Sequence, residues 1–176
     1  PVGNYFKGSK IPCISVEITH EFHRASSKGV GSAKTIGNYA SSLYPLNLAK
    51  SKGFDEVMYL NAENELLIDE LGSANIFIIK DNIIKTPKLT GAILAGVTRD
   101  SVIQIAKEIL KMDVEETEIS ISDVLSADEV FCTGTAVVIS PIGKITNNEA
   151  TTKISDEIGP ISLKLREILT EIQLQK

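Results

Sequence analysis

Short apolar runs separated by turn residues are the sequence feature that most restricts the fold of this chain. Some runs alternate apolar with polar residues and others are briefly continuous, and both patterns are typical of β-strands. We expect strands at 14–22, 57–60, 66–68, 76–79, 83–84, 114–121, 129–132 and 137–139. Helical spacing of apolar residues predicts helices at 38–52, after Gly96 through 109, at 122–127 and at 161–173. The chain is therefore predicted to be a mixed α/β protein.

Particular residues set the expected ends and bends of these elements. Pro45 lies inside the first helix, and a proline in a helix interior costs about 3 kcal/mol, so we expect a bend one turn before it. Thr98, or the residue before it, is expected to cap the second helix, and Ser122 the third. The strand at 137–139 is expected to end at Pro141.

Composition and charge exclude several classes of protein. With 43% apolar and 23% charged residues, the 176 residues are enough for one globular domain with a core. The net charge is −5 and the basic residues are scattered, which argues against nucleic-acid binding. No apolar run is long enough to cross a membrane, and no targeting peptide is visible. Because the chain opens on PVGNYF, we expect its first residues to come from the middle of a protein.

Cysteine and histidine residues give no metal-ligand pattern. Cys13 and Cys132 are far apart, which indicates a reducing compartment, although a single disulfide stays open. His20 and His23 are three residues apart but lack a third ligand. No metal site is expected.

Lys34 lies among small residues in GVGSAKTIGNY (29–39), just before an expected helix. Small neighbours let a bulky planar group approach the backbone, and glycine permits the turn that this requires. An amine held there, partly out of water, would lose proton affinity and become a nucleophile toward carbonyl groups. An ordinary surface lysine is the alternative reading.

Two turns and one acid could serve the same ligand. The turn at 95–98 lies at a helix start, where free N–H groups and the helix dipole favour phosphate. The turn at 133–136 offers hydroxyl groups and a glycine-exposed backbone. Glu70 precedes the small residues of LGSAN (71–75). A cap, a tight turn and an exposed acid are the alternatives, but together with the lysine these are the groups that pyridoxal phosphate needs.

Four longer motifs occur in order: KTIGNYA (34–40), the segment from Glu70 to NIF (75–77), GVTR (96–99) and DEVFCTGTA (128–136). With them, the chain from PVGNYF to about Gly143 resembles the C-terminal large domain of branched-chain amino acid aminotransferases, which are fold-type-IV pyridoxal-phosphate enzymes. It looks most like the plant-type members. The resemblance implies an α/β (α+β) fold with a mixed β-sheet or pseudo-barrel and surrounding helices. It also implies an interdomain loop at 1–12, a cofactor-binding large domain at 13–176, and an N-terminal small domain that this chain lacks.

The resemblance assigns cofactor roles to residues of these motifs. Lys34 matches the lysine that holds pyridoxal phosphate covalently and then carries a proton between the substrate and the cofactor. Glu70 matches the acid that pairs with the pyridine nitrogen, and Tyr39 matches the tyrosine that hydrogen-bonds the phenolic oxygen. The other implied contacts are a small hydroxyl residue, the backbone phosphate cradle and a hydroxyl beside it, namely Ser73, Val97, Thr98 and Thr135.

The resemblance also implies a reaction and its partners. The expected reaction transfers the amino group of leucine, isoleucine or valine to 2-oxoglutarate, giving a branched 2-oxo acid and glutamate, as in branched-chain amino acid biosynthesis. Tyr5, Tyr39 and Ala136 match substrate-binding positions. A homodimer is expected for the full-length protein, with no nucleic-acid or membrane partner. The expected location is intracellular: cytoplasmic, or in a plastid or mitochondrion if a transit peptide lies upstream.

Departures from the family pattern keep other functions open. Ala95 stands where proline is usual, Pro45 interrupts the helix after the lysine, and no arginine of the chain matches the phosphate-binding arginine of the small domain. A D-amino acid aminotransferase or an aminodeoxychorismate lyase would use the same fold. The alternative that is not an enzyme is a truncated, non-catalytic remnant.

Overall fold

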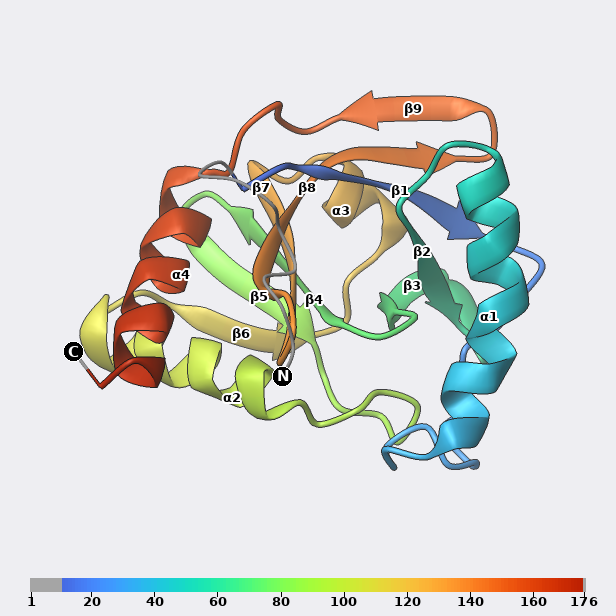
Figure 1. The fold of residues 1–176 in the computed structure, drawn as a ribbon, viewed down its shortest axis with the longest axis horizontal. Helices are drawn as coiled ribbons and strands as arrows, with labels where there is room; N and C mark the ends of the chain where they lie inside the picture. The colour runs from blue at the N-terminus through green and yellow to red at the C-terminus, as the bar shows by residue number, and fades with distance from the viewer. Residues whose placement is uncertain (1–10, 176) are drawn as a thin grey trace.

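Nine strands in residues 11–175, the part of the chain that the computed structural model describes, form one curved mixed sheet (Figure 1). The strands are β1 (Ile14–Thr19), β2 (Glu56–Asn61), β3 (Asn64–Leu71), β4 (Asn75–Lys80), β5 (Ile83–Pro87), β6 (Val114–Thr117), β7 (Glu129–Gly134), β8 (Val138–Asn147) and β9 (Ala150–Lys153). The helices are α1 (Ile36–Ser51), α2 (Val97–Gln104), which continues as the π-helical segment η1 (Ile105–Ile109), α3 (Ile121–Leu125) and α4 (Pro160–Gln173). The prediction of a mixed α/β chain is confirmed.

The strand order is β3-β2-β1-β8-β7-β4-β5-β6, with β9 paired to β8. Strand β1 is parallel to both β2 and β8, and β5 is parallel to β6, whereas the other pairs are antiparallel. The register of β4 on β7 places Asn75 opposite Thr133. Two polar residues are thereby fixed side by side at one end of the sheet.

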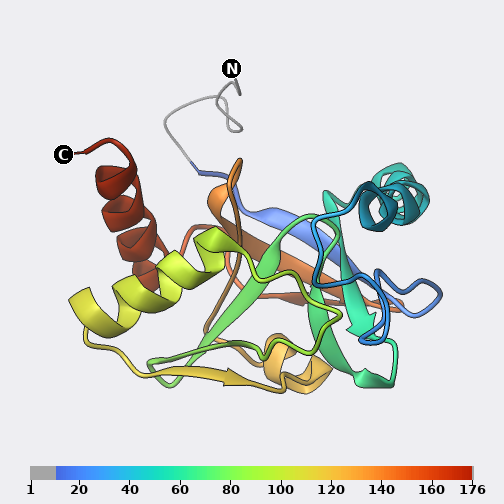
Figure 2. The same ribbon diagram turned by 90° about the horizontal axis from the view of Figure 1, so that it is seen from below.

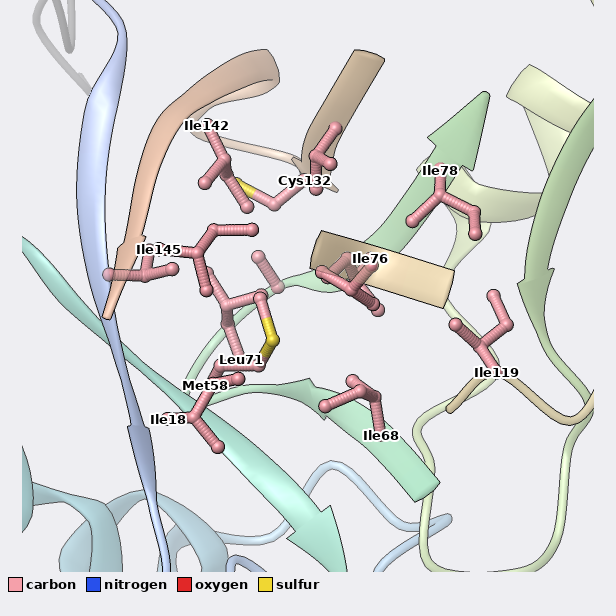
Figure 3. Close-up of a cluster of buried hydrophobic side chains, with 14 of the residues drawn as sticks. Ile18, Met58, Ile68, Leu71, Ile76, Ile78, Ile119, Cys132, Ile142 and Ile145 are labelled. Atoms are coloured by element: carbon pink, nitrogen blue, oxygen red, sulfur yellow. The ribbon is translucent and has the colours of Figure 1, made fainter. Parts of the chain in front are cut away.

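The two edges of the sheet approach each other, so that the sheet nearly closes. Leu67 on β3 forms an isolated antiparallel bridge with Ser120, which follows β6, and Ile68 N donates to Ile119 O at 2.8 Å. Figure 3 shows the apolar side chains that fill the interior, where Met58 and Leu71 lie among isoleucines from several strands. This interior core supports the pseudo-barrel expected from the resemblance.

Helices cover the outer face of the sheet in two places. Figure 2 shows α2 and α4 side by side at one end and α1 at the other. Phe77 and Phe131 stack with ring centroids 5.1 Å apart in the cluster that packs under α2 and α4. The start of α4 is fixed by Glu129, whose carboxylate accepts from the backbone N–H groups of Ile161 (3.0 Å) and Ser162 (2.9 Å).

Helix α1 runs through Pro45, as predicted for the helix at 38–52, and it begins two residues earlier, at Ile36. Pro45 is buried, and Ala49 packs against Val57 and Tyr59 of β2. Because burying apolar surface is favourable, this packing offsets the helix hydrogen bond that proline cannot make.

Several expected boundaries were wrong, among them two helix caps, the end of the strand expected at 114–121, which stops at Thr117, and one strand end at a proline. Gly96, not Thr98 or its predecessor, is the N-cap residue of α2. Ser120, not Ser122, caps α3, because Ser120 and Asp123 form a reciprocal capping box. Strand β8 continues past Pro141, close to the irregularity where the β1 partner changes from Ile142 to Lys144.

The pattern also missed β9, a short and largely exposed strand. Within residues 11–175, no helix has both the length and the apolar character needed to span a membrane.

Candidate active site

One cavity of about 260 Å³ brings together all the residues expected to bind the cofactor. It lies where four connections meet: the loop before α1, the β3–β4 turn, the loop before α2 and the β7–β8 turn. Figure 1 shows the loop before α2 reaching the loop before α1 at the edge of the molecule. The residues gathered there include Lys34, Tyr39, Glu70, Ser73, Val97, Thr98 and Thr135.

The loop that carries Lys34 is held by the first turn of α1. Buried Asn38 donates from Nδ2 to the carbonyl oxygens of Val30 (2.9 Å) and Ala33 (3.1 Å). A Cβ at Gly31 would overlap the backbone of Ala92, so glycine allows this loop to contact the loop before α2. The small residues therefore let the two loops contact each other, and they also leave space beside the cavity.

Lys34 lines the cavity but is exposed, whereas the sequence argument placed its amine partly out of water. The difference arises because its loop lies at the rim and no segment within residues 11–175 covers it. Tyr39, at the start of α1, is half-buried and lines the same wall.

Glu70 is the buried charge of the cavity, with 3% of its surface exposed. Its Oε1 atom lies 2.5 Å from Arg24 Nη2 and accepts from Leu94 N at 3.0 Å, and its Oε2 atom accepts from Asn75 Nδ2 at 2.9 Å. Burial raises the pKa of Glu70 to about 7, although the Arg24 charge and the Leu94 hydrogen bond act in the opposite direction. A second cationic group beside this carboxylate would lower its pKa again and hold it ionised.

Arg24 is a site residue that sequence reasoning missed. It lines the cavity, is 8% exposed, and donates to the carbonyl oxygens of Gly31 (3.0 Å) and Ala92 as well as pairing with Glu70. No sequence motif marks it: it follows His20 and His23, which gave no metal-ligand pattern. The one hint in the sequence was that arginine is rare in this chain, which has only two others.

Asn75 is the second missed residue. It lies in the quoted motif that begins at Glu70, but the motif gave it no role. The structure buries it against Glu70 and the loop before α2, where Nδ2 also donates to Leu94 O at 2.8 Å.

The far end of the cavity can hold an anion. Helix α2 begins after Gly96, and no carbonyl within residues 11–175 accepts from the backbone N–H of Val97 or Thr98. Thr133 Oγ1 is buried on the same cavity and has no hydrogen-bond partner in the described part of the chain. These donors, at the positive end of a helix, form a site of the kind that binds phosphate. The exposed Thr135 hydroxyl lies beside them.

Ala136, an expected substrate residue, does not line this cavity in the described chain. Ala136 is exposed in the β7–β8 turn, directly after Thr135. Tyr5 lies outside the described residues. Ala95, which stands where proline was expected from the resemblance, lines the cavity in a loop where Gly96 N donates to Leu94 O at 2.9 Å.

Comparison with known proteins gives a consistent picture. The model of the class IV amino-transferase family matches residues 10–145. Branched-chain-amino-acid aminotransferase 5, chloroplastic, of Arabidopsis thaliana is 45% identical over 99% of this chain and 42% of its own length. Branched-chain-amino-acid transaminase 1 of Bacillus subtilis is 40% identical over 100% of this chain and 51% of its own length. The chain thus spans about half the length, or somewhat less, of these relatives.

Solved structures show the same fold. The branched-chain aminotransferase of Thermoproteus uzoniensis with norvaline superposes with a TM-score of 0.85 at 32% identity, over 100% of this chain and 55% of that one. The Escherichia coli branched-chain amino acid aminotransferase gives 0.85 at 30% identity, over 98% and 55%. A PLP-form of the Thermobaculum terrenum enzyme gives 0.82 at 28% identity, over 91% and 50%.

Proposed function

Because the chain belongs to the class IV aminotransferase family, we propose that it is the cofactor-binding part of a pyridoxal-phosphate-dependent branched-chain-amino-acid transaminase. The observation that carries this proposal is a single cavity that joins an amine, a buried carboxylate and a helix N-terminus, through Lys34, Glu70 and the start of α2. The names of its relatives supply the substrate class: leucine, isoleucine and valine as amino donors. We take 2-oxoglutarate as the acceptor.

The residues fit pyridoxal phosphate at both ends. Glu70 would hold the pyridine nitrogen, and the N–H groups of Val97 and Thr98 would hold the phosphate, with Thr135 beside them. Thr133 Oγ1, which is buried without a partner among residues 11–175, is a further polar group at the phosphate end. When bound, the cofactor supplies a carbonyl carbon that takes the amino group and a ring that withdraws electrons.

The chain's own residues would orient the reactants and move one proton. Lys34 Nζ would hold the cofactor, and once it is free its amine would take the proton from the substrate Cα and later give it back. The exposed position of Lys34 leaves room for this exchange. Tyr39 would donate from its phenol to the cofactor's phenolic oxygen.

Glu70 would set the electronic state of the ring. Desolvation penalises its charge, so a protonated pyridine nitrogen is a favourable partner that Glu70 stabilises in return. Arg24 adds a second positive contact on Oε1. Together, the protonated ring nitrogen and Arg24 would keep the Glu70 carboxylate ionised and oriented.

We assign residues 13–176 to the large domain and 1–12 to an interdomain loop, and we infer that a small domain completes the substrate pocket over Lys34. Ala136 would meet the substrate carboxylate, and Tyr5 the side-chain pocket. The whole protein is proposed to be a homodimer. Its location would follow its leader: plastid or mitochondrion with a transit peptide, as in relatives named chloroplastic and mitochondrial, and cytoplasm without one.

The test is leucine-dependent formation of glutamate from 2-oxoglutarate by the protein that carries this chain, with D-alanine as the competing donor. We expect turnover with L-leucine, little with D-alanine, and none in Lys34→Ala. Preference for D-alanine would instead assign a D-amino acid aminotransferase. No turnover with either donor would favour the non-catalytic remnant.

A further inference from the structure

One buried amide joins the two ends of the cavity. Asn75 Nδ2 lies 2.9 Å from Glu70 Oε2 and 2.8 Å from Leu94 O, so its two N–H groups reach the carboxylate and the loop before α2. The side chain is well shielded, since Asn75 is 5% exposed. Its backbone is fixed by the pairing of β4 with β7, opposite Thr133.

The loop at 92–96 is held from several sides. Leu94 N donates to Glu70 Oε1 at 3.0 Å, and Arg24 donates to Ala92 O. A Cβ at Gly96 would overlap Asn75 Oδ1, so the amide packs directly over the last residue before α2. Asn75 is therefore in contact with both the carboxylate and the helix start.

We propose that Asn75 is a positioning residue that fixes Glu70 and the loop at 92–96 relative to each other, so that one side chain sets both the ring contact and the phosphate cradle. The inference rests on the proposed function, which places pyridoxal phosphate in this cavity. It concerns residues of this chain and needs no contact between Asn75 and the cofactor.

The hydrogen bonds explain why an amide is needed. Oε1 of Glu70 has two donors, whereas Oε2 has only Asn75 within the described part of the chain, which leaves Oε2 free to accept a further N–H. The terminal torsion of a glutamate is broad, so the Asn75 hydrogen bond decides where that oxygen points. Aspartate has the same shape but donates nothing and adds a negative charge.

Two variants of the full chain separate these effects. Asn75→Asp keeps the shape of the side chain but removes both N–H donors and adds a charge. Asn75→Ser adds no charge, but its shorter side chain cannot reach both Glu70 and Leu94. Asn82→Asp, at an exposed turn, is the matched control for the added charge. Arg24, Asp69 and Arg99, the other charged groups acting on Glu70, stay unchanged throughout.

Three measurements report on Glu70 and on the loop at 92–96, the two groups that Asn75 joins. NMR titration of ¹³C-labelled glutamate, with the Glu70 signal identified by Glu70→Gln, should show a higher pKa for Glu70 in both Asn75 variants than in the parent. Hydrogen exchange at Leu94 N should become about tenfold faster. The dissociation constant for pyridoxal phosphate should rise about tenfold. Asn82→Asp should change none of these.

The parent chain provides a test that does not depend on variant folding. The side-chain amide protons of Asn75 should shift with the same midpoint as Glu70 when the pH is varied. Midpoints that differ, or folded Asn75 variants with an unchanged Glu70 titration and Leu94 exchange, would overturn the proposal. A parent chain that fails to bind pyridoxal phosphate would contradict the proposed function instead, because the first two readouts need no cofactor.

Discussion

Burial of the Glu70 carboxylate costs free energy, and a positively charged ligand group beside it would recover part of that free energy. The barrel wall and the loop before α2 remove its carboxylate from water, and Arg24, Leu94 and Asn75 only partly replace that water. A pKa of about 7 follows, well above the usual value of 4.5. The folded chain therefore binds a proton that the unfolded chain has released between these pH values.

Glu70→Gln should remove this linkage. Between about pH 4.5 and pH 7 the raised pKa makes the free energy of unfolding fall as pH rises, by up to about 3 kcal/mol from this group. Urea unfolding of parent and variant at about pH 5 and pH 8 gives the difference between them. The parent should lose stability relative to Glu70→Gln at the higher pH. The same difference at both pH values would contradict the assignment.

At the residue scale, sequence reasoning found the groups that face the ligand and missed those that hold them. Lys34, Glu70 and Thr98 stand in recognisable motifs and meet in one cavity. Arg24 and Asn75 could not be assigned, because their partners are backbone and carboxylate atoms that only the folded loops bring near. Such contacts leave no periodic signal in the sequence.

At the scale of elements, local signals failed where tertiary packing or neighbouring residues decided the outcome. The strand expected to end at Pro141 instead continues through it, close to an irregular pairing, whereas the helix predicted at 38–52 does run through Pro45 and packs on β2. The hydrophobic spacing of α4 was strong enough to be predicted nearly to its ends. A buried proline is thus tolerated in both elements, but only the one in β8 was unexpected from the sequence.

Glycine-to-alanine substitutions at the starts of α2 and α1 should change the free energy of unfolding in opposite directions. Gly96→Ala places a Cβ onto Asn75 Oδ1, which should lower the free energy of unfolding by about 1–3 kcal/mol and loosen the phosphate end. Gly37→Ala, in the first turn of α1 with nothing within 4 Å of its Cβ, should raise it by at most about 0.5 kcal/mol. Urea unfolding compares both with the parent. Equal effects of the two substitutions would show that the Asn75 contact does not constrain Gly96.

At the scale of the molecule, the curvature of the sheet makes the site. Blocks of strands from the two halves of the chain follow one another in the sheet order, and the Leu67–Ser120 bridge joins its two edges. Four connections then meet at one rim, although they are scattered along the sequence. Strand patterns alone do not encode this closure; the family resemblance implied it.

The measurement that tests the account most directly is borohydride trapping. The chain is incubated with pyridoxal phosphate, reduced, digested and analysed by mass spectrometry to locate the modified lysine. We predict a single adduct at Lys34, because only this amine shares a cavity with the buried carboxylate and the start of α2 in the described chain. No adduct, or labelling scattered over surface lysines such as Lys50 and Lys52, would contradict the claim that these residues form the cofactor site.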